Sequence, residues 1–299
     1  MKPIAFNREF DPAYGTLVAV TPLIRRLVAA NNGPFTAWGT GTYVIGHGEV
    51  AVIDPGPLDL AHIEALQAAL KQERIAQLVI THTHLDHSPA AAVLRERCGA
   101  EVVGAGPHGA RGETTEAGAD YDHVPDRQMF DGDRLEGKGW TLTAVATPGH
   151  TSNHVCFCLE EERSLFTGDH VMGWSTTVVS PPDGDMLAYM ASLDRLLGRT
   201  DLLYYPTHGA PIPKPQDFVR QLLGHRRERE AQVLDCVAAG CDTIEAMVKK
   251  LYVDVDPGLH RAAGRSVLAH LLKLITESRV TRQPESGDNL EEQRFVLQP

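Results

Sequence analysis

One short run of residues constrains the fold of this chain more than any other: His82-Thr83-His84-Leu85-Asp86-His87. Its four chemically active side chains, three imidazoles and a carboxylate, stand at positions i, i+2, i+4 and i+5. On a strand the first three would share one face and the fourth would lie opposite, and on a helix the second would point away from the first and third. We therefore predict a bend between a buried strand at Leu78–Ile80 and a helix with Ser88 as N-cap and Pro89 as first residue.

Three later segments share one pattern, an apolar strand that ends in a short turn carrying a His or an Asp. The side chains that these turns deliver are His150, Asp169 and His208, after strands predicted at 141–146, 164–166 and 202–205. Strand ends along one sheet edge are where α/β folds place their chemistry. A lone histidine in such a place is usually structural, but four such segments together favour one shared site. Seven candidate ligands exceed the four of a tetrahedral ion, which indicates two metal ions.

The ligand types also indicate which metal and which reaction to expect. Imidazoles and carboxylates suit zinc better than magnesium, so we expect two zinc ions, with iron and manganese as alternatives. Zinc lowers the pKa of a bound water and polarises a carbonyl or phosphoryl oxygen, and both effects serve hydrolysis. Asp86 is the candidate catalytic residue, because it is placed to orient the nucleophile or to move a proton. The sequence identifies no acid for the leaving group.

These motifs carry a family resemblance. His82-x-His84-x-Asp86-His87, Pro148-Gly-His150-Thr, Phe166-Thr-Gly-Asp169 and Thr207-His208-Gly, in this order, resemble the metallo-β-lactamase superfamily over about residues 31–213. The resemblance implies a four-layer αβ/βα sandwich with a binuclear zinc site. It assigns one metal to His82, His84 and His150, the other to Asp86, His87 and His208, and a bridging role to Asp169. Asp54 matches the first acidic motif of the superfamily and would orient a ligand histidine through a hydrogen bond.

A cluster of prolines between residues 206 and 215 predicts a domain boundary. We expect a catalytic domain at 1–213 and a smaller domain at 214–299. Helices are predicted at 217–239, from Asp242 or Thr243 onward, and at 259–278, followed by short strands at 280–283 and 293–297 around the loop at 284–288. Three helices and a hairpin are a winged-helix-like pattern, so the expected class is α/β with a C-terminal winged-helix-like domain.

The C-terminal part narrows the resemblance. The segments His225-Arg-x-x-Arg229-Glu, Leu259-His-Arg-Ala-Ala263 and His270-Leu-Leu-Lys-Leu274 are similar to the β-lactamase-like protein 2 branch of the superfamily. Animal members of that branch are endoribonucleases that prefer single strands, so the resemblance implies single-stranded RNA as the first candidate substrate. One alternative is a hydrolase of a small ester, thioester or lactone. The other is a persulfide-dioxygenase-like enzyme with a single iron, which would need fewer ligands.

Charge and cysteine content bear on these alternatives. The net charge of −11 lies entirely before Lys214, because the remainder holds 13 basic and 13 acidic residues. A nucleic-acid-binding surface would be basic, so the acidic catalytic region favours the ester alternative. Five cysteines, an odd number, indicate free thiols in a reducing compartment. With no apolar leader or span, we expect a cytoplasmic protein with no membrane partner; the oligomeric state, monomer or dimer, stays open.

Other features are interpreted as structural. Cys156 and Cys158 are expected to pack in a strand, and His154 to pack or to buttress the site. The glycine-rich segment 104–109 is interpreted as a solvated loop, because the polar residues after it do not make an apolar helix for a dinucleotide. The alternating charges at 226–230 predict a solvated helix face.

Overall fold

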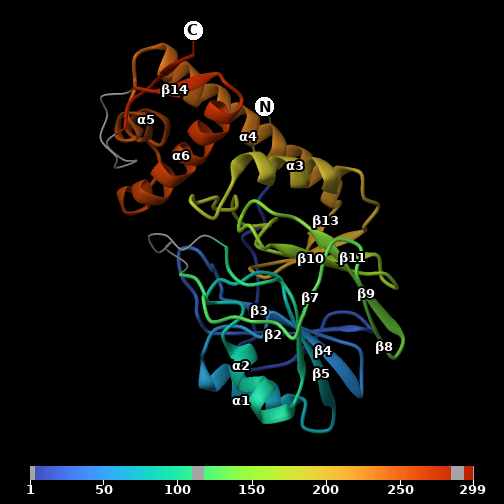
Figure 1. The fold of residues 1–299 in the computed structure, drawn as a ribbon. Helices are drawn as coiled ribbons and strands as arrows, with labels where there is room; N and C mark the ends of the chain where they lie inside the picture. The colour runs from blue at the N-terminus through green and yellow to red at the C-terminus, as the bar shows by residue number, and fades with distance from the viewer. Residues whose placement is uncertain (1–3, 110–117, 284–292, 299) are drawn as a thin grey trace.

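The structure is a computed structural model that describes residues 4–109, 118–283 and 293–298. Most of the chain forms a four-layer αβ/βα sandwich, in which two β-sheets face each other and helices cover the outer face of each sheet (Figure 1). The α/β class and the four layers are those that the sequence predicts.

The first sheet is built from the N-terminal half of the chain, with its strands in sequence order. They are β1 (Val18–Ala19), β2 (Ile24–Val28), β3 (Gly41–Ile45), β4 (Glu49–Ile53), β5 (Arg74–Ile80), β6 (Glu101–Gly104) and β7 (Arg127–Gln128). β1 to β4 pair antiparallel, whereas β4 to β7 pair parallel. The parallel pairing brings the carboxyl ends of β4, β5 and β6 to the same edge of the sheet.

The second sheet has six strands in the order β13-β12-β11-β10-β9-β8. They are β8 (Arg134–Gly137), β9 (Trp140–Ala146), β10 (Val155–Leu159), β11 (Ser164–Gly168), β12 (Leu203–Pro206) and β13 (Ile212–Pro213). β10 is antiparallel to both β9 and β11, and β11 is parallel to β12. The three strands β9, β11 and β12 therefore run the same way and end at one edge.

Large apolar side chains fill the space between the sheets, among them Tyr43, Phe157 and Phe166, and the ring centroids of Tyr43 and Phe166 are 5.0 Å apart. Helices α1 (Leu60–Ala69) and α2 (Ala90–Cys98) pack on the outer face of the first sheet. Helices α3 (Met186–Leu197) and α4 (Pro215–Ala238) pack on the outer face of the second. Strands such as β3 and β10 are buried along their whole length because a layer covers each of their faces.

The predicted start of α2 is wrong in its detail. The helix begins at Ala90, and Pro89 occupies the N-cap position without a side-chain hydrogen bond. Ser88 does not cap the helix, because its hydroxyl donates a hydrogen bond of 2.6 Å to Asp120 Oδ2 instead.

The C-terminal part contains the predicted three helices and hairpin. After α4 come α5 (Ile244–Leu251), a short 3-10 helix (Pro257–Leu259), α6 (His260–Thr276) and the antiparallel strands β14 (Val280–Arg282) and β15 (Phe295–Leu297). Thr243 is the N-cap of α5 and accepts a hydrogen bond from the backbone N–H of Ala246. The predicted loop at 284–288 lies outside the described residues.

Helix α4 belongs to two apolar cores. Side chains of its first half, such as Phe218 and Leu222, pack with the sandwich, whereas Val233 and Val237 from its second half pack with α5 and α6. We therefore propose that the boundary predicted at residue 213 separates two units that share one helix. Figure 1 shows α4 running from the sandwich into the C-terminal part.

The prediction of a solvated helix face at 226–230 is wrong for two of its residues. Arg226 and Glu230 are only 3% and 8% exposed, whereas Arg227 and Glu228 are exposed. Arg226 and Glu230 are four residues apart and therefore lie on the same face of the helix. This face of α4 packs against the rest of the protein.

The cysteines behave as predicted. All five are free thiols, and Cys156 and Cys158 of β10 pack in the core beneath α3 and α4. Within the described ranges, none of the helices combines the length and apolar character needed to cross a bilayer.

Candidate metal centre

The seven side chains predicted as ligands come together at one edge of the sandwich. The run at 82–87 forms the predicted bend between β5 and α2. His150 follows β9 after a turn, Asp169 directly follows β11, and His208 follows β12. Because these strands end at neighbouring positions of two facing sheets, residues more than a hundred positions apart meet in space.

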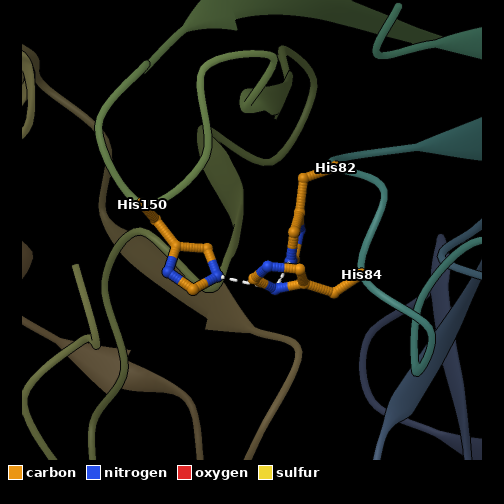
Figure 2. Close-up of side chains that lie close together, drawn as sticks. All are labelled: His82, His84 and His150. Carbon is orange, nitrogen blue, oxygen red and sulfur yellow. Dashed lines mark hydrogen bonds between the residues drawn. The ribbon is translucent and has the colours of Figure 1, made fainter. Parts of the chain in front are cut away.

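Three imidazoles converge at one point of this edge. The Nδ1 atom of His84 lies 3.1 Å from the Nε2 atom of His82 and 3.1 Å from the Nε2 atom of His150. Figure 2 shows the three rings turned toward one another, two from the loop after β5 and one from the loop after β9. Burial, together with the neighbouring imidazoles, holds the pKa of His82 and His84 well below the ordinary value, and burial lowers that of His150. Three neutral rings that aim nitrogen lone pairs at one point can bind a cation.

A second group lies beside the first. The Nε2 atom of His208 is 3.1 Å from Asp86 Oδ2 and 3.4 Å from Asp169 Oδ1, and the Nε2 atom of His87 is 3.5 Å and 3.6 Å from the same two oxygens. The other oxygen of Asp169, Oδ2, lies 3.8 Å from His150 Nε2 in the first group. Asp169 therefore faces both groups, one oxygen to each.

Charge in this second group is balanced by carboxylates. Burial alone would lower the pKa of His87 and His208, but Asp86 and Asp169 outweigh it and raise the pKa of His208 to about 10 and that of His87 well above the ordinary value. The two imidazoles in turn outweigh burial and hold the pKa of Asp86 and Asp169 low. A cation at this point would take the place of protons, as metal binding to histidine usually does.

The geometry of both groups fits zinc. Ligand atoms about 2.0–2.1 Å from a tetrahedral zinc ion lie about 3.3 Å from one another, and the separations above range from 3.1 to 3.8 Å. Three buried atoms that point into the site, His87 Nε2, His208 Nε2 and Asp169 Oδ1, have no hydrogen-bond partner among the described residues. Buried polar atoms without partners are rare, and a bound ion is one of the accepted reasons for them.

Asp54 fixes the orientation of His87. It directly follows β4 in the left-handed region, with φ of 46°, and is fully buried. Its Oδ2 atom accepts hydrogen bonds from His87 Nδ1 at 2.9 Å and from the hydroxyls of Thr81 and Thr207 at 2.8 and 2.9 Å, and its Oδ1 atom accepts one from the backbone N–H of Thr81 at 2.9 Å. Because the Nδ1 proton is held there, the lone pair of His87 Nε2 faces the site. These contacts support the orienting role predicted for Asp54.

Backbone carbonyl groups orient two other histidine rings of the site, as Asp54 orients His87. Val178 O lies 2.6 Å from His150 Nδ1 and Gly39 O lies 3.1 Å from His208 Nδ1, so each Nδ1 donates its proton and the lone pair of Nε2 faces the site. His154, expected to lie in a strand and to pack or to buttress the site, lies just before β10. Its Nδ1 bonds to the Thr147 hydroxyl and its Nε2 accepts from the backbone N–H of Asp169, contacts that favour the buttressing role.

A pocket of about 210 Å³ opens over the two groups. Its floor is formed by four of the predicted ligands, and its walls are largely apolar. The lining residues are Gly33, Pro34, Phe35, Thr36, His84, Asp86, His108, His150, Asp169, Met172, Val178, Ser180, Asp183 and Gly184. Among the described residues that line it, none is a lysine or an arginine.

Sequence reasoning missed two titratable residues of this pocket, His108 and Asp183. His108 lies in the segment interpreted as a solvated loop, yet its side chain is 3% exposed and bonds through Nδ1 to the Thr83 hydroxyl at 2.8 Å. Asp183 accepts hydrogen bonds from the hydroxyl and backbone N–H of Ser152 and lies 3.7 Å from His108 Nε2. The only signal in the sequence was that His108 follows a strand, like the ligands.

Comparisons with known proteins agree with this geometry. A profile described as "Metallo-beta-lactamase superfamily" matches residues 36–208, and one described as "Beta-lactamase associated winged helix domain" matches residues 243–288. The chain is 37% identical over 224 residues to an atrochrysone carboxyl ACP thioesterase of Aspergillus fumigatus, a match that covers 72% of this chain and 65% of that protein. It is 31% identical over 284 residues to an atrochrysone carboxyl ACP thioesterase of Aspergillus chevalieri, covering 90% of this chain and 86% of that protein.

A solved structure shows the same fold over nearly the whole chain. A beta-lactamase domain protein from Burkholderia ambifaria superposes with a TM-score of 0.79 at 22% identity, covering 97% of this chain and 95% of that one. The strand-end ligands, the four-layer sandwich and the matched profiles lead to one conclusion: the chain belongs to the metallo-β-lactamase superfamily and carries its associated winged-helix domain.

Proposed function

We propose that this chain is a binuclear zinc-dependent hydrolase that cleaves a small acyl thioester. Membership of the superfamily makes it a metal-dependent hydrolase. The number of ions, the identity of the metal and the substrate are the parts that we propose.

The proposal of two zinc ions rests on the donor atoms. His82, His84 and His150 would hold one ion, Asp86, His87 and His208 the other, and Asp169 would contact both. A single iron, as in the persulfide-dioxygenase alternative, would leave the second group of donors without a role.

The proposed class of substrate rests on the pocket that opens above the metal-donor atoms. Pro34, Phe35, Met172 and Val178 give it apolar walls, and its charged lining residues are aspartates and histidines. A site for RNA would have to bind phosphates, which proteins do chiefly with Lys and Arg. The pocket therefore favours the ester or thioester alternative over single-stranded RNA.

Two further points favour a thioester within that class. The curated relatives described above are thioesterases by name, and the first of them is matched over 65% of its length. A thiol has a pKa of about 8.5, so it leaves without strong help from an acid. The alkoxide that leaves from an ester or from RNA needs more help, and the sequence offered no clear leaving-group acid.

Bound zinc would polarise the thioester carbonyl and lower the pKa of a water molecule. The chain itself would bind the acyl group against Phe35 and Met172 and keep bulk water away. Asp86 both faces His208 and lines the pocket, which supports the proposal that its carboxylate orients the attacking water and accepts its proton.

Metal analysis and a substrate comparison test the proposal. Protein purified without added metal should contain about two zinc ions per chain, and one iron per chain would overturn the metal assignment. A short acyl thioester of N-acetylcysteamine should be hydrolysed much faster than a labelled single-stranded RNA is cleaved, and His84→Ala should abolish this turnover. An intact thioester beside rapidly cleaved RNA would decide for the endoribonuclease reading.

A further inference from the structure

One wall of the pocket is a long segment without regular secondary structure. It joins β11 to α3, spans residues 169–185, and contributes Met172, Val178 and Ser180 to the pocket. It begins with Asp169, whose two oxygens face the two groups of donors. The position of this segment therefore affects both the metal centre and the substrate space.

Two hydroxyls hold the first turn of this segment. Thr177 Oγ1 lies 2.7 Å from the carbonyl oxygen of Asp169 and 3.1 Å from that of His170, so its hydroxyl donates to the backbone of the bridging residue. Tyr189 of α3 donates from its hydroxyl to the carbonyl of His170 at 3.0 Å. Both side chains are buried.

The next contact in this series comes from the C-terminal part. Arg226 of α4 donates a hydrogen bond from its guanidinium to the carbonyl oxygen of Thr177, and the guanidinium carbon lies 5.3 Å from the ring centroid of Tyr189. Arg265 of α6 donates to the carbonyl oxygen of Pro181, further along the same segment, at 3.3 Å. Two helices of the C-terminal part thus hold the backbone of one pocket wall.

The burial of Arg226 makes this arrangement informative. An arginine side chain carries a charged guanidinium, and Arg226 is only 3% exposed in the folded protein. A buried charge is costly unless it is fully hydrogen-bonded, and an apolar residue would fill the same place on α4 more cheaply. A planar group with several N–H donors can instead reach a backbone carbonyl and an aromatic face at once.

We propose that Arg226 is a positioning residue. It ties α4 to Thr177, and through Thr177 it sets the position of Asp169 and of the pocket wall. The winged-helix domain would then act on the metal centre by holding the 169–185 segment. The kinetic part of this inference rests on the proposed function, whereas the metal-binding part does not.

The chain offers a matched control in the next residue. Arg227 lies beside Arg226 on α4, but its side chain is 62% exposed and forms an ion pair with Asp194 on the surface, at 3.3 Å. We would compare Arg226→Met, Arg226→Lys, Thr177→Val and Arg227→Met with the unmodified protein. The zinc affinity of each is measured by competition with a chromophoric chelator, and thermal melting with near-ultraviolet circular dichroism establishes that each variant is folded.

We expect Arg226→Met and Thr177→Val to lose about tenfold in zinc affinity, the lower end of the effect of contacts that orient ligands. They should also raise KM for the thioester, while Arg226→Lys restores part of both and Arg227→Met changes neither. Unchanged zinc affinity and KM in folded Arg226→Met would overturn the inference. If Arg226→Met does not fold, the same two measurements on Thr177→Val decide. If the unmodified protein hydrolyses no thioester, the proposed function fails and the zinc comparison still tests Arg226.

Discussion

Replacing Asp54 with asparagine should weaken zinc binding even though the size of the side chain hardly changes. Asp54 accepts four hydrogen bonds, three of them at Oδ2. If the asparagine oxygen keeps the bond to the backbone N–H of Thr81, its amide group takes the place of Oδ2 and faces His87 Nδ1. The hydroxyls of Thr81 and Thr207 can rotate, but a ring N–H cannot.

His87 would then have to move its proton to Nε2, which is the atom that faces the metal site. In the opposite orientation, the amide group meets the backbone N–H of Thr81 and leaves a buried donor unsatisfied, which costs about 1–3 kcal/mol. The first orientation turns a protonated His87 Nε2 toward the metal site, and the second keeps the bond to His87 Nδ1 but destabilises the fold around Asp54. Loss of such an orienting partner typically reduces metal affinity by about tenfold to a hundredfold, equal to about 1.4–2.7 kcal/mol.

The assay is chelator competition on Asp54→Asn, with zinc content measured by mass spectrometry. Asp194→Asn is the control, because Asp194 is exposed on α3 and touches only Arg227 among the described charged side chains. Full zinc affinity in a folded Asp54→Asn protein would show that His87 does not need this partner, and the reasoning would be refuted.

Three other changes test the core, the acid stability and the metal. Phe157→Ala should lower the free energy of unfolding by about 3–5 kcal/mol, because Phe157 is fully buried between the sheets. Phe130→Ala, at a site that is 63% exposed, should change this free energy little. Equal effects of the two substitutions in denaturant titrations would contradict the assignment of the core. Burial, together with the nearby Arg226 and Arg229, lowers the pKa of His225 from 6.5 to about 4. Between these two pH values the unfolded chain binds a proton that the folded chain does not. The free energy of unfolding therefore falls as the pH falls through this range. His225→Gln should make that fall shallower, and an unchanged difference between about pH 7 and about pH 4.5 in urea titrations would count against the shift. Removing metal with a chelator should lower Tm and abolish turnover, and added zinc should restore both. The shift in Tm is expected because a ligand that binds only the folded state stabilises it. A Tm that does not depend on zinc would contradict a metal held by buried ligands.

The strand-end ligands could be predicted because they depend on local patterns. The run at 82–87 fits no regular element, so the sequence itself predicts a bend after β5. Each of His150, Asp169 and His208 follows an apolar stretch, and the direction of the strands then brings them together.

Elements with mixed polarity were not predicted. β2 contains the adjacent charged residues Arg25 and Arg26, which obscure the alternation of apolar and polar residues that is typical of a strand. In the structure Arg25 pairs with Glu73, and Arg26 lies over the ring of Phe10. Helix α3 was missed although its buried residues have helical spacing. Its N-cap, Asp185, follows an irregular segment that gave no earlier sign of a helix.

The pocket and its supports could not be predicted, because they depend on contacts between distant segments. Nothing near His108 in the sequence shows that Asp183 lies beside it. The alternating charges around Arg226 are typical of a solvated helix, and only the packing of α4 against the sandwich shows that this arginine is buried.

Helix α4 has a practical consequence for anyone who expresses this protein in pieces. A chain cut after residue 213 would lack Phe218, Val219 and Leu222, and so would leave part of the outer face of the second sheet bare. Such an uncovered apolar surface promotes aggregation. A shortened catalytic unit should therefore retain α4 at least through Leu223. Engineering that exchanges one domain should exchange both domains together.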